Sequence, residues 1–237
     1  MSYPREIRFV GLALVAVFLL GGIAAASASA AAFEATPSFP VKFTAKGGPG
    51  FLETKAGHRV ACKESEGSGE VASATTVAKV EVKFKGCFAE GFPLLKCGTA
   101  TAASGEITTK GIKGKPVDID KAKTKAGILL EPEAELFAEF ECEFSIIKEK
   151  VKVKGSVIGK VKDEDLNKFT KTLHLELKEL KGTPEPNQVE EAGEKHVLLT
   201  KGEGTEPFEF EESGIQEAVL GETTTTALEG KEIKLIP

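Results

Sequence analysis

The strongest constraint on the fold is a regular alternation of apolar and charged residues between Leu136 and Val157. Within 138–144 every second residue is a glutamate, and the residues between are Ala, Phe, Cys and Phe. Within 150–154 lysine alternates with valine. A period of two residues is that of a strand with one buried and one solvent-facing side. The segment therefore predicts a β-hairpin whose acidic outer face lies beside a basic one, as cross-strand pairing favours.

Shorter runs of the same kind follow along the chain, separated by glycine, proline and polar residues. About a dozen short strands with glycine-rich breaks are typical of a sandwich or a barrel. We therefore predict an all-β fold, an antiparallel β-sandwich or a barrel-like domain, and leave that choice open. Residues 33–237 are expected to form one domain, with a weaker boundary at 182–195, and Gly47-Gly-Pro-Gly predicts a turn.

Residues 1–32 have the pattern of a secretory signal peptide. Arg5 and Arg8 precede an uninterrupted apolar run at residues 9–26, and small residues follow it. Cleavage is expected after one of three alanines: Ala28, Ala30 or Ala32. The run approaches the roughly 18 to 20 residues of a membrane span, so an uncleaved N-terminal anchor is the alternative. No later apolar segment is long enough to span a bilayer. The sequence thus predicts a secreted protein without a membrane span after signal cleavage.

The chain has four cysteines, Cys62, Cys87, Cys97 and Cys142. In an exported protein an even number of cysteines predicts disulfides, and these spacings do not provide the close pairs that zinc prefers. Residues 88–96 resemble a loop between strands, which favours a Cys87–Cys97 disulfide. The remaining pair is then Cys62–Cys142.

Composition limits the kinds of partner. The formal net charge is −5, with lysine and glutamate interspersed. This argues against nucleic-acid binding, which requires a basic patch. There is no tryptophan, and the single tyrosine, Tyr3, lies in the predicted signal. Sugar-binding grooves, protein-binding hot spots and the aromatic belts of membrane barrels rely on these residues, so all three become less favoured.

The three histidines, His58, His174 and His196, have no metal-ligand spacing to one another. His174 alternates with Leu173 and Leu175, which predicts a solvent-facing imidazole. All three are therefore interpreted as surface histidines.

One loop has a partial calcium-binding pattern. Asp163, Asp165 and Asn167 offer oxygen ligands at alternate positions, as calcium loops do at their start. Lys168 stands where an EF-hand needs glycine, and His174 stands where it needs glutamate. An ordinary polar loop is therefore the preferred interpretation, and no metal or cofactor is predicted.

No catalytic residue stands out. A Gly-x-Ser-x-Gly elbow is absent, and disulfide-bonded cysteines leave no nucleophilic thiol. Two carboxylates could still hydrolyse a glycoside if they faced each other across a sugar. In this sequence, however, the acidic residues alternate with lysine on outward faces, and nothing selects a pair.

Several short motifs together resemble a group of secreted, β-rich actinobacterial proteins for which no activity is known. They are Cys62, Gly86-Cys87, Cys97 with Ser104-Gly-Glu-Ile-Thr-Thr, and Phe140-Glu-Cys142 with Gly155-Ser-Val-Ile-Gly159. The likeness covers roughly residues 40–180. It implies a protein exported by a Gram-positive bacterium and implies no activity.

Three hypotheses for function follow. The first is a secreted, non-enzymatic β domain that serves as a binding or structural module of the cell surface or the medium. The second is a β-barrel carrier of a small apolar ligand, which would require a closed sheet around a cavity of several hundred cubic ångströms. The third is a carboxylate-based hydrolase, which would require two facing acids with pKa values pushed apart.

Overall fold

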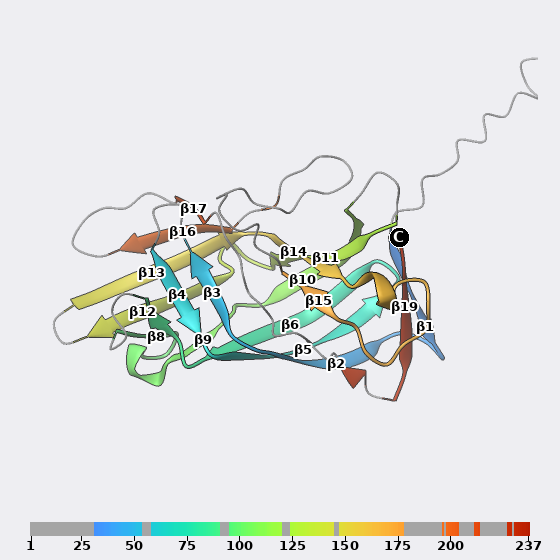
Figure 1. Ribbon diagram of the computed structural model, residues 1–237, viewed down its shortest axis with the longest axis horizontal. Helices are drawn as coiled ribbons and strands as arrows, with labels where there is room; N and C mark the ends of the chain where they lie inside the picture. Colours follow the sequence, from blue (N-terminus) through green and yellow to red (C-terminus); the bar gives the residue numbers. More distant parts are fainter. Residues whose placement is uncertain are drawn as a thin grey trace, which may run out of the picture.

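The computed structural model describes residues 31–53, 58–90, 95–119, 124–144, 147–177, 196, 198–203, 211–213, 227–228 and 230–237. Within them the chain is β-strand apart from loops and two short 3-10 turns, η1 (Ala102–Ser104) and η2 (Asp163–Asp165). The paired strands run antiparallel, which confirms the predicted all-β antiparallel class (Figure 1). No helix in these ranges is long and apolar enough to cross a membrane. Residues 1–30 of the predicted signal and the predicted boundary at 182–195 lie outside the described residues.

Most described strands belong to two large sheets. The nine-stranded sheet has the order β15-β14-β11-β10-β6-β5-β2-β18, and β9 pairs with β6 beside that path. Its strands are β2 (Val41–Gly47), β5 (Glu64–Ser73), β6 (Thr76–Lys85), β9 (Glu106–Thr108), β10 (Ile112–Asp118), β11 (Ala126–Pro132), β14 (Val157–Val161), β15 (Leu175–Glu176) and β18 (Ala227–Leu228).

The eight-stranded sheet has the order β17-β16-β13-β12-β8-β7-β4-β3. Its strands are β3 (Gly50–Glu53), β4 (Arg59–Cys62), β7 (Phe88–Ala89), β8 (Lys96–Gly98), β12 (Ala138–Phe144), β13 (Ile147–Gly155), β16 (Leu198–Glu203) and β17 (Glu211–Ser213). A separate pair joins β1 (Ala32–Thr36) to β19 (Glu232–Ile236) at the end of the molecule opposite β12 and β13 (Figure 1).

Two ribbons of paired strands pass from one sheet into the other. In the first, β2 pairs with β5 as far as Gly47↔Ser65, and β3 pairs with β4 from Gly50↔Cys62 in the same register. The second ribbon joins the β11–β14 pair to the β12–β13 pair. The predicted turn at Gly47–Gly50 is therefore wrong: these residues form a bend inside a continuing ribbon. Strands that change sheets at bends produce the corners of sandwiches and barrel-like folds.

Glycine occupies two points where a strand leaves one sheet for the other. Gly86 lies between β6 and β7 with φ +64°, and Gly155 ends β13, just before β14, with φ +105°. Side chains disfavour positive φ, so glycine allows the backbone to turn there without strain. At Gly86 an added Cβ would also lie 2.9 Å from the Lys63 side chain.

One apolar core joins the two sheets and the β1–β19 pair. Phe33 of β1 and Leu235 of β19 are almost completely buried in it, at 2% and 0% exposure. The core also contains Val41 and Ile112 from the nine-stranded sheet and Phe140 from the eight-stranded sheet. The inward-facing apolar residues of the strands therefore pack into one common core.

The predicted central hairpin is confirmed as β12 and β13, with Glu141 opposite Lys150 and Glu143 opposite Lys148. Glu139 lies between two ammonium groups, since its carboxylate is 2.8 Å from Lys110 Nζ and 2.7 Å from Lys150 Nζ. These hydrogen bonds, from Lys110 first and then Lys150, lower the pKa of Glu139 to about 2. The outer face of the hairpin thus carries two cross-strand ion pairs, Glu139 with Lys150 and Glu143 with Lys148.

The predicted disulfide pairing is wrong, although all four cysteines are disulfide-bonded. The structure pairs Cys62 with Cys87 and Cys97 with Cys142. Cys87 and Cys97 are indeed adjacent, because the Cys97 N–H donates to the Cys87 carbonyl at 3.0 Å. Each side chain nevertheless bonds to a third or fourth cysteine: Cys87 to Cys62 and Cys97 to Cys142. Cys97 is directly opposite Cys142 in the β8–β12 pair. One disulfide therefore links β4 to the residue just before β7, and the other links β8 to β12.

Removing the second disulfide should destabilise the domain. For the double variant Cys97→Ala/Cys142→Ala we expect the free energy of unfolding to fall by about 2 to 5 kcal/mol, because the unfolded chain loses a constraint. Urea unfolding monitored by circular dichroism measures this change. The variant should contain no free thiol, since Cys62–Cys87 persists. A non-reducing digest of the unmodified protein that linked the Cys87 peptide to the Cys97 peptide would contradict the pairing.

Glu139 should make stability depend on pH. Its pKa is lowered by folding, so its contribution is complete above the ordinary glutamate pKa and is lost as the pH falls through about 2. Glu139→Gln should reduce the free energy of unfolding by about 1 kcal/mol near neutral pH, the scale of partly exposed ion pairs. In urea unfolding, the difference between the two proteins should shrink towards pH values near 2. Glu141→Gln, on the same strand, is the control. An equal difference at every pH would rule out this role.

Candidate functional site

A cavity of about 140 Å³ lies between the two sheets. Side chains from both sheets form its wall. The nine-stranded sheet and its bends contribute Val82, Phe84, Ile107, Leu130 and Val157. The eight-stranded sheet contributes Phe51, Leu52, Val60, Phe140, Val153 and Leu198. Each belongs to a strand or its immediate end, so the scaffold of the fold positions the whole wall.

The bends in the ribbons account for the position of this cavity. Gly50 and Cys62 stand at the bend of the first ribbon, Val157 stands at the bend of the second, and all three line the cavity. Paired strands that turn from one sheet into another separate the two layers locally. The inward side chains then leave unfilled space beside the bends.

The chemistry of the described wall is almost wholly apolar. Aliphatic residues predominate, together with four phenylalanines: Phe51, Phe84, Phe137 and Phe140. Among the described lining residues none is charged, and Thr109 alone carries a hydroxyl. A wall of this kind can hold an apolar molecule but offers no nucleophile or general base.

A second cavity of about 90 Å³ lies on the inner side of β2, β5, β6 and β11. It shares Val82 and Leu130 with the larger cavity, so the two spaces meet at these side chains. Both are smaller than the space expected for a barrel carrier. In the described residues each large sheet is also an open succession of strands and not a closed ring. The interior is therefore suited to a small ligand.

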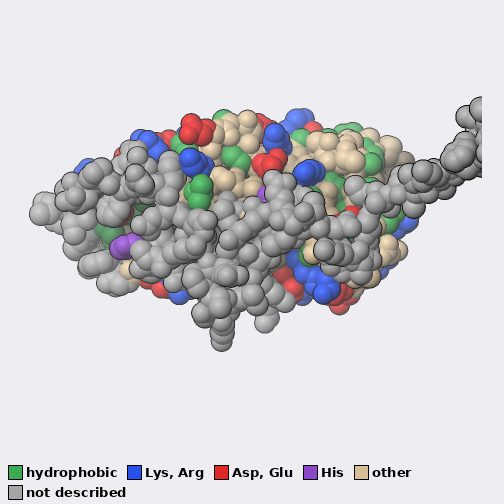
Figure 2. All heavy atoms as spheres, turned by 90° about the horizontal axis from the view of Figure 1, so that it is seen from above, with side chains coloured by type: hydrophobic (Ala, Val, Ile, Leu, Met, Phe, Trp, Pro, Cys, Tyr) green, Lys and Arg blue, Asp and Glu red, His purple; other side chains and the backbone are tan. Residues whose placement is uncertain are grey.

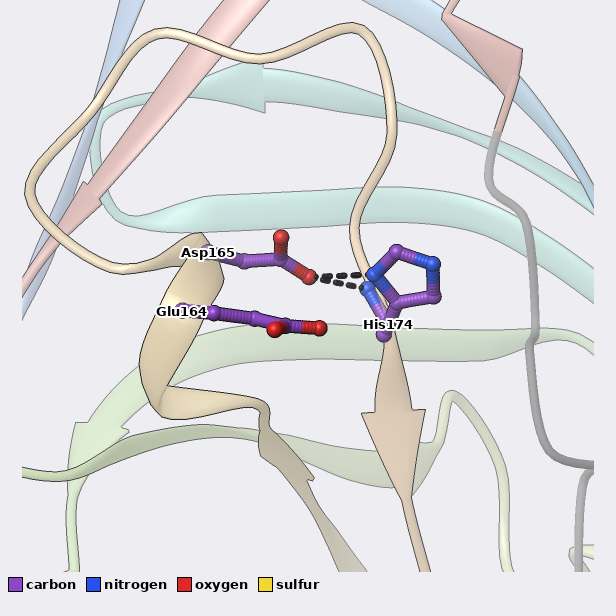
Figure 3. A group of neighbouring side chains, drawn as sticks. All are labelled: Glu164, Asp165 and His174. Atoms are coloured by element: carbon purple, nitrogen blue, oxygen red, sulfur yellow. Dashed lines mark hydrogen bonds and ion pairs between the residues drawn. The ribbon is translucent and has the colours of Figure 1, made fainter.

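A polar cluster lies on the loop between β14 and β15. Asp165 in η2 is buried, with 4% exposure, and its Oδ2 accepts hydrogen bonds from the His174 backbone N–H at 2.8 Å and from the ring Nδ1 at 2.6 Å. Figure 3 shows both bonds, with the Glu164 carboxylate alongside and the second ring nitrogen of His174 directed away from both acids. The prediction that His174 faces solvent is therefore wrong: its side chain is 20% exposed and holds the loop closed through Asp165.

The cluster contains three potential metal ligands. Glu164, Asp165 and His174 place one donor atom each within 4.8 Å of one another, a mixed oxygen and nitrogen set of the kind that suits zinc. However, His174 Nδ1 is already engaged by Asp165, and the buried carboxylate is satisfied by this bond, by the His174 backbone N–H and by Lys168 Nζ, which is 3.9 Å from Asp165 Oδ1.

The residues of the partial calcium pattern, Asp163, Asp165 and Asn167, make separate contacts. The Asp163 carboxylate forms an ion pair with Lys160 Nζ at 3.0 Å, whereas Asp165 faces His174. The Asn167 backbone has a positive φ of 59°, and its N–H donates to the Leu235 carbonyl at 2.9 Å. The loop is thus attached to β19 through its backbone.

The prediction that His196 is a surface histidine is wrong. His196, with 5% exposure, has its Nδ1 2.8 Å from the Ser156 hydroxyl oxygen, at the bend between β13 and β14. These residues are 40 positions apart, and no local motif marks them as a pair. The bond fastens the sheet-changing bend to the segment before β16.

Two described acids, Glu66 and Glu139, have shifted pKa values, and neighbouring lysines lower both of them. Figure 2 shows acidic and basic side chains interleaved over the described part of one face. Glu139 has its pKa lowered by Lys110 and Lys150, whereas a general acid needs a raised pKa. Comparisons with protein-family models, with curated proteins and with solved structures found no match to this chain.

Proposed function

We propose that this chain is an exported β-sandwich protein that binds a small apolar molecule between its two sheets. The observation that carries the proposal is the cavity of about 140 Å³ whose described wall is apolar apart from Thr109. The protein would act as a binding module of the medium or the cell surface and not as an enzyme.

The size of the cavity supports a ligand of about six carbon atoms. Cavities of roughly 150 Å³ lined by Leu, Ile and Phe stay dry and bind benzene. Filling such a space removes the ligand from water, which contributes roughly 0.8 kcal/mol per buried carbon. Six carbons give about 5 kcal/mol, which corresponds to a dissociation constant on the order of 10⁻⁴ M.

Export is supported by three features. Arg5, Arg8 and the apolar run at residues 9–26 form the pattern of a signal peptide. The two disulfides fit an oxidising compartment. The resemblance to secreted actinobacterial proteins points the same way. We propose cleavage after Ala28 or Ala30, because β1 begins at Ala32 and pairs from that residue with β19.

Benzene binding tests the proposed function. At ten times its dissociation constant, benzene should stabilise the protein by about 1.4 kcal/mol and raise the Tm by roughly 3 to 6 °C. Differential scanning calorimetry with and without benzene measures the shift. No shift in the unmodified protein as benzene approaches saturation would refute the proposal.

A matched pair of variants localises the binding. Ala138→Val/Val153→Leu adds three carbons to the cavity wall and should abolish most of the benzene-dependent shift. Ala126→Val/Val161→Leu adds the same atoms at buried positions that line neither cavity, and should retain the shift. An equal loss in both variants would place the ligand elsewhere.

Mass spectrometry of protein secreted by a Gram-positive host tests export. We expect a mature chain that begins at Ser29 or Ala31, because cleavage at either point leaves β1 whole. Recovery of the protein only in the membrane fraction, with Met1 intact, would favour the anchored alternative.

A further inference from the structure

Thr109 interrupts the apolar wall of the larger cavity. It is buried, with 5% exposure, in the segment between β9 and β10. It also contacts both sheets, through a bridge to Ala138 of β12 and a backbone hydrogen bond to the Val82 carbonyl of β6 at 2.9 Å. Its backbone is therefore fixed from two sides, and its side chain can orient a ligand.

Only part of the hydrogen-bonding capacity of the Thr109 hydroxyl is used within the described residues. Its oxygen accepts a hydrogen bond from the Val82 backbone N–H at 2.9 Å. A hydroxyl also has one proton to donate, and within the described part of the chain that proton has no acceptor. A buried donor without an acceptor is unfavourable. A bound molecule with an acceptor atom would remove this deficit.

Aromatic rings define the rest of the recognition. Phe51 and Phe140 from the eight-stranded sheet, Phe84 from the nine-stranded sheet, and Phe137 before β12 all face the same cavity. Phenylalanine rings pack well against other rings in edge-to-face and offset geometries. A charged ligand is disfavoured, since the described wall has no counter-ion and burial of an unpaired charge is costly.

From these features we infer that the ligand is a single flat ring with one hydrogen-bond acceptor, oriented by the Thr109 hydroxyl. The inference rests on the proposed function and specifies the chemical class that the cavity selects. A ring nitrogen, carbonyl or ether oxygen that accepts from Thr109 Oγ1 meets the requirement, while the remaining ring atoms contact the phenylalanines.

The test compares benzene with pyridine, which has the same size and one acceptor nitrogen, at a pH where pyridine is uncharged. Dissociation constants are measured by calorimetry for the unmodified protein, Thr109→Val and Thr109→Ser. In Thr109→Val the affinity for pyridine relative to benzene should fall roughly threefold to tenfold, the scale of one hydrogen bond. Thr109→Ser keeps the hydroxyl and should keep the ratio. A ratio that is the same in all three proteins would overturn the inference.

Two outcomes separate this inference from the proposed function. If neither ring binds the unmodified protein, the proposed function is wrong. If benzene binds and the ratio does not depend on Thr109, only the inference about the acceptor is wrong. Because Thr109→Val leaves the Val82 N–H unpaired and could unfold the protein, a crystal structure of the unmodified protein with pyridine is the second test. The nitrogen should lie within hydrogen-bond distance of Thr109 Oγ1, and a nitrogen directed elsewhere overturns the inference.

Discussion

The passage of paired strands from one sheet into the other is the constraint on which the structure depends. In the first ribbon the register of β2 with β5 continues unchanged into β3 with β4, so no hydrogen-bonded pair has to be re-formed on the other side of the bend. The same two chain segments therefore contribute strands to both layers, and the sheets cannot separate without breaking the ribbons. At two crossings between the layers the chain adopts positive φ, and glycine occupies both of them, Gly86 and Gly155.

The disulfides and the cavity are both consequences of these bends. Cys62 ends β4 at the bend of the first ribbon and reaches Cys87, which follows the bend at Gly86. The second disulfide continues the connection from Cys97 to Cys142. Close packing is hardest to achieve where strands diverge, and that is where Gly50, Cys62 and Val157 leave the space that they line. The disulfides and the apolar cavity therefore both lie beside the bends of the ribbons.

The polar contacts at the loops stabilise the path of the chain, whereas the polar group at the cavity, Thr109, is placed to contact a ligand. Asp165 satisfies both the backbone and the ring of His174, and Ser156 contacts His196 at a bend, so these groups stabilise particular chain paths. Thr109 accepts one hydrogen bond and keeps a proton to donate beside an apolar space. The difference lies in whether the buried group is fully satisfied by the protein itself.

The sequence alone determined the all-β antiparallel class, the inward and outward faces of the β12–β13 hairpin and the participation of all four cysteines in disulfides, because alternation and composition are local properties. It did not determine which strands become neighbours, since those contacts join residues far apart in the chain. Only the tertiary structure decided that Gly47–Gly50 bends instead of reversing the chain, and that Cys87 pairs with Cys62 although Cys97 lies beside it. It likewise brought His174 to Asp165 and formed the cavity, because empty space arises from the mutual geometry of two layers, which no single segment encodes.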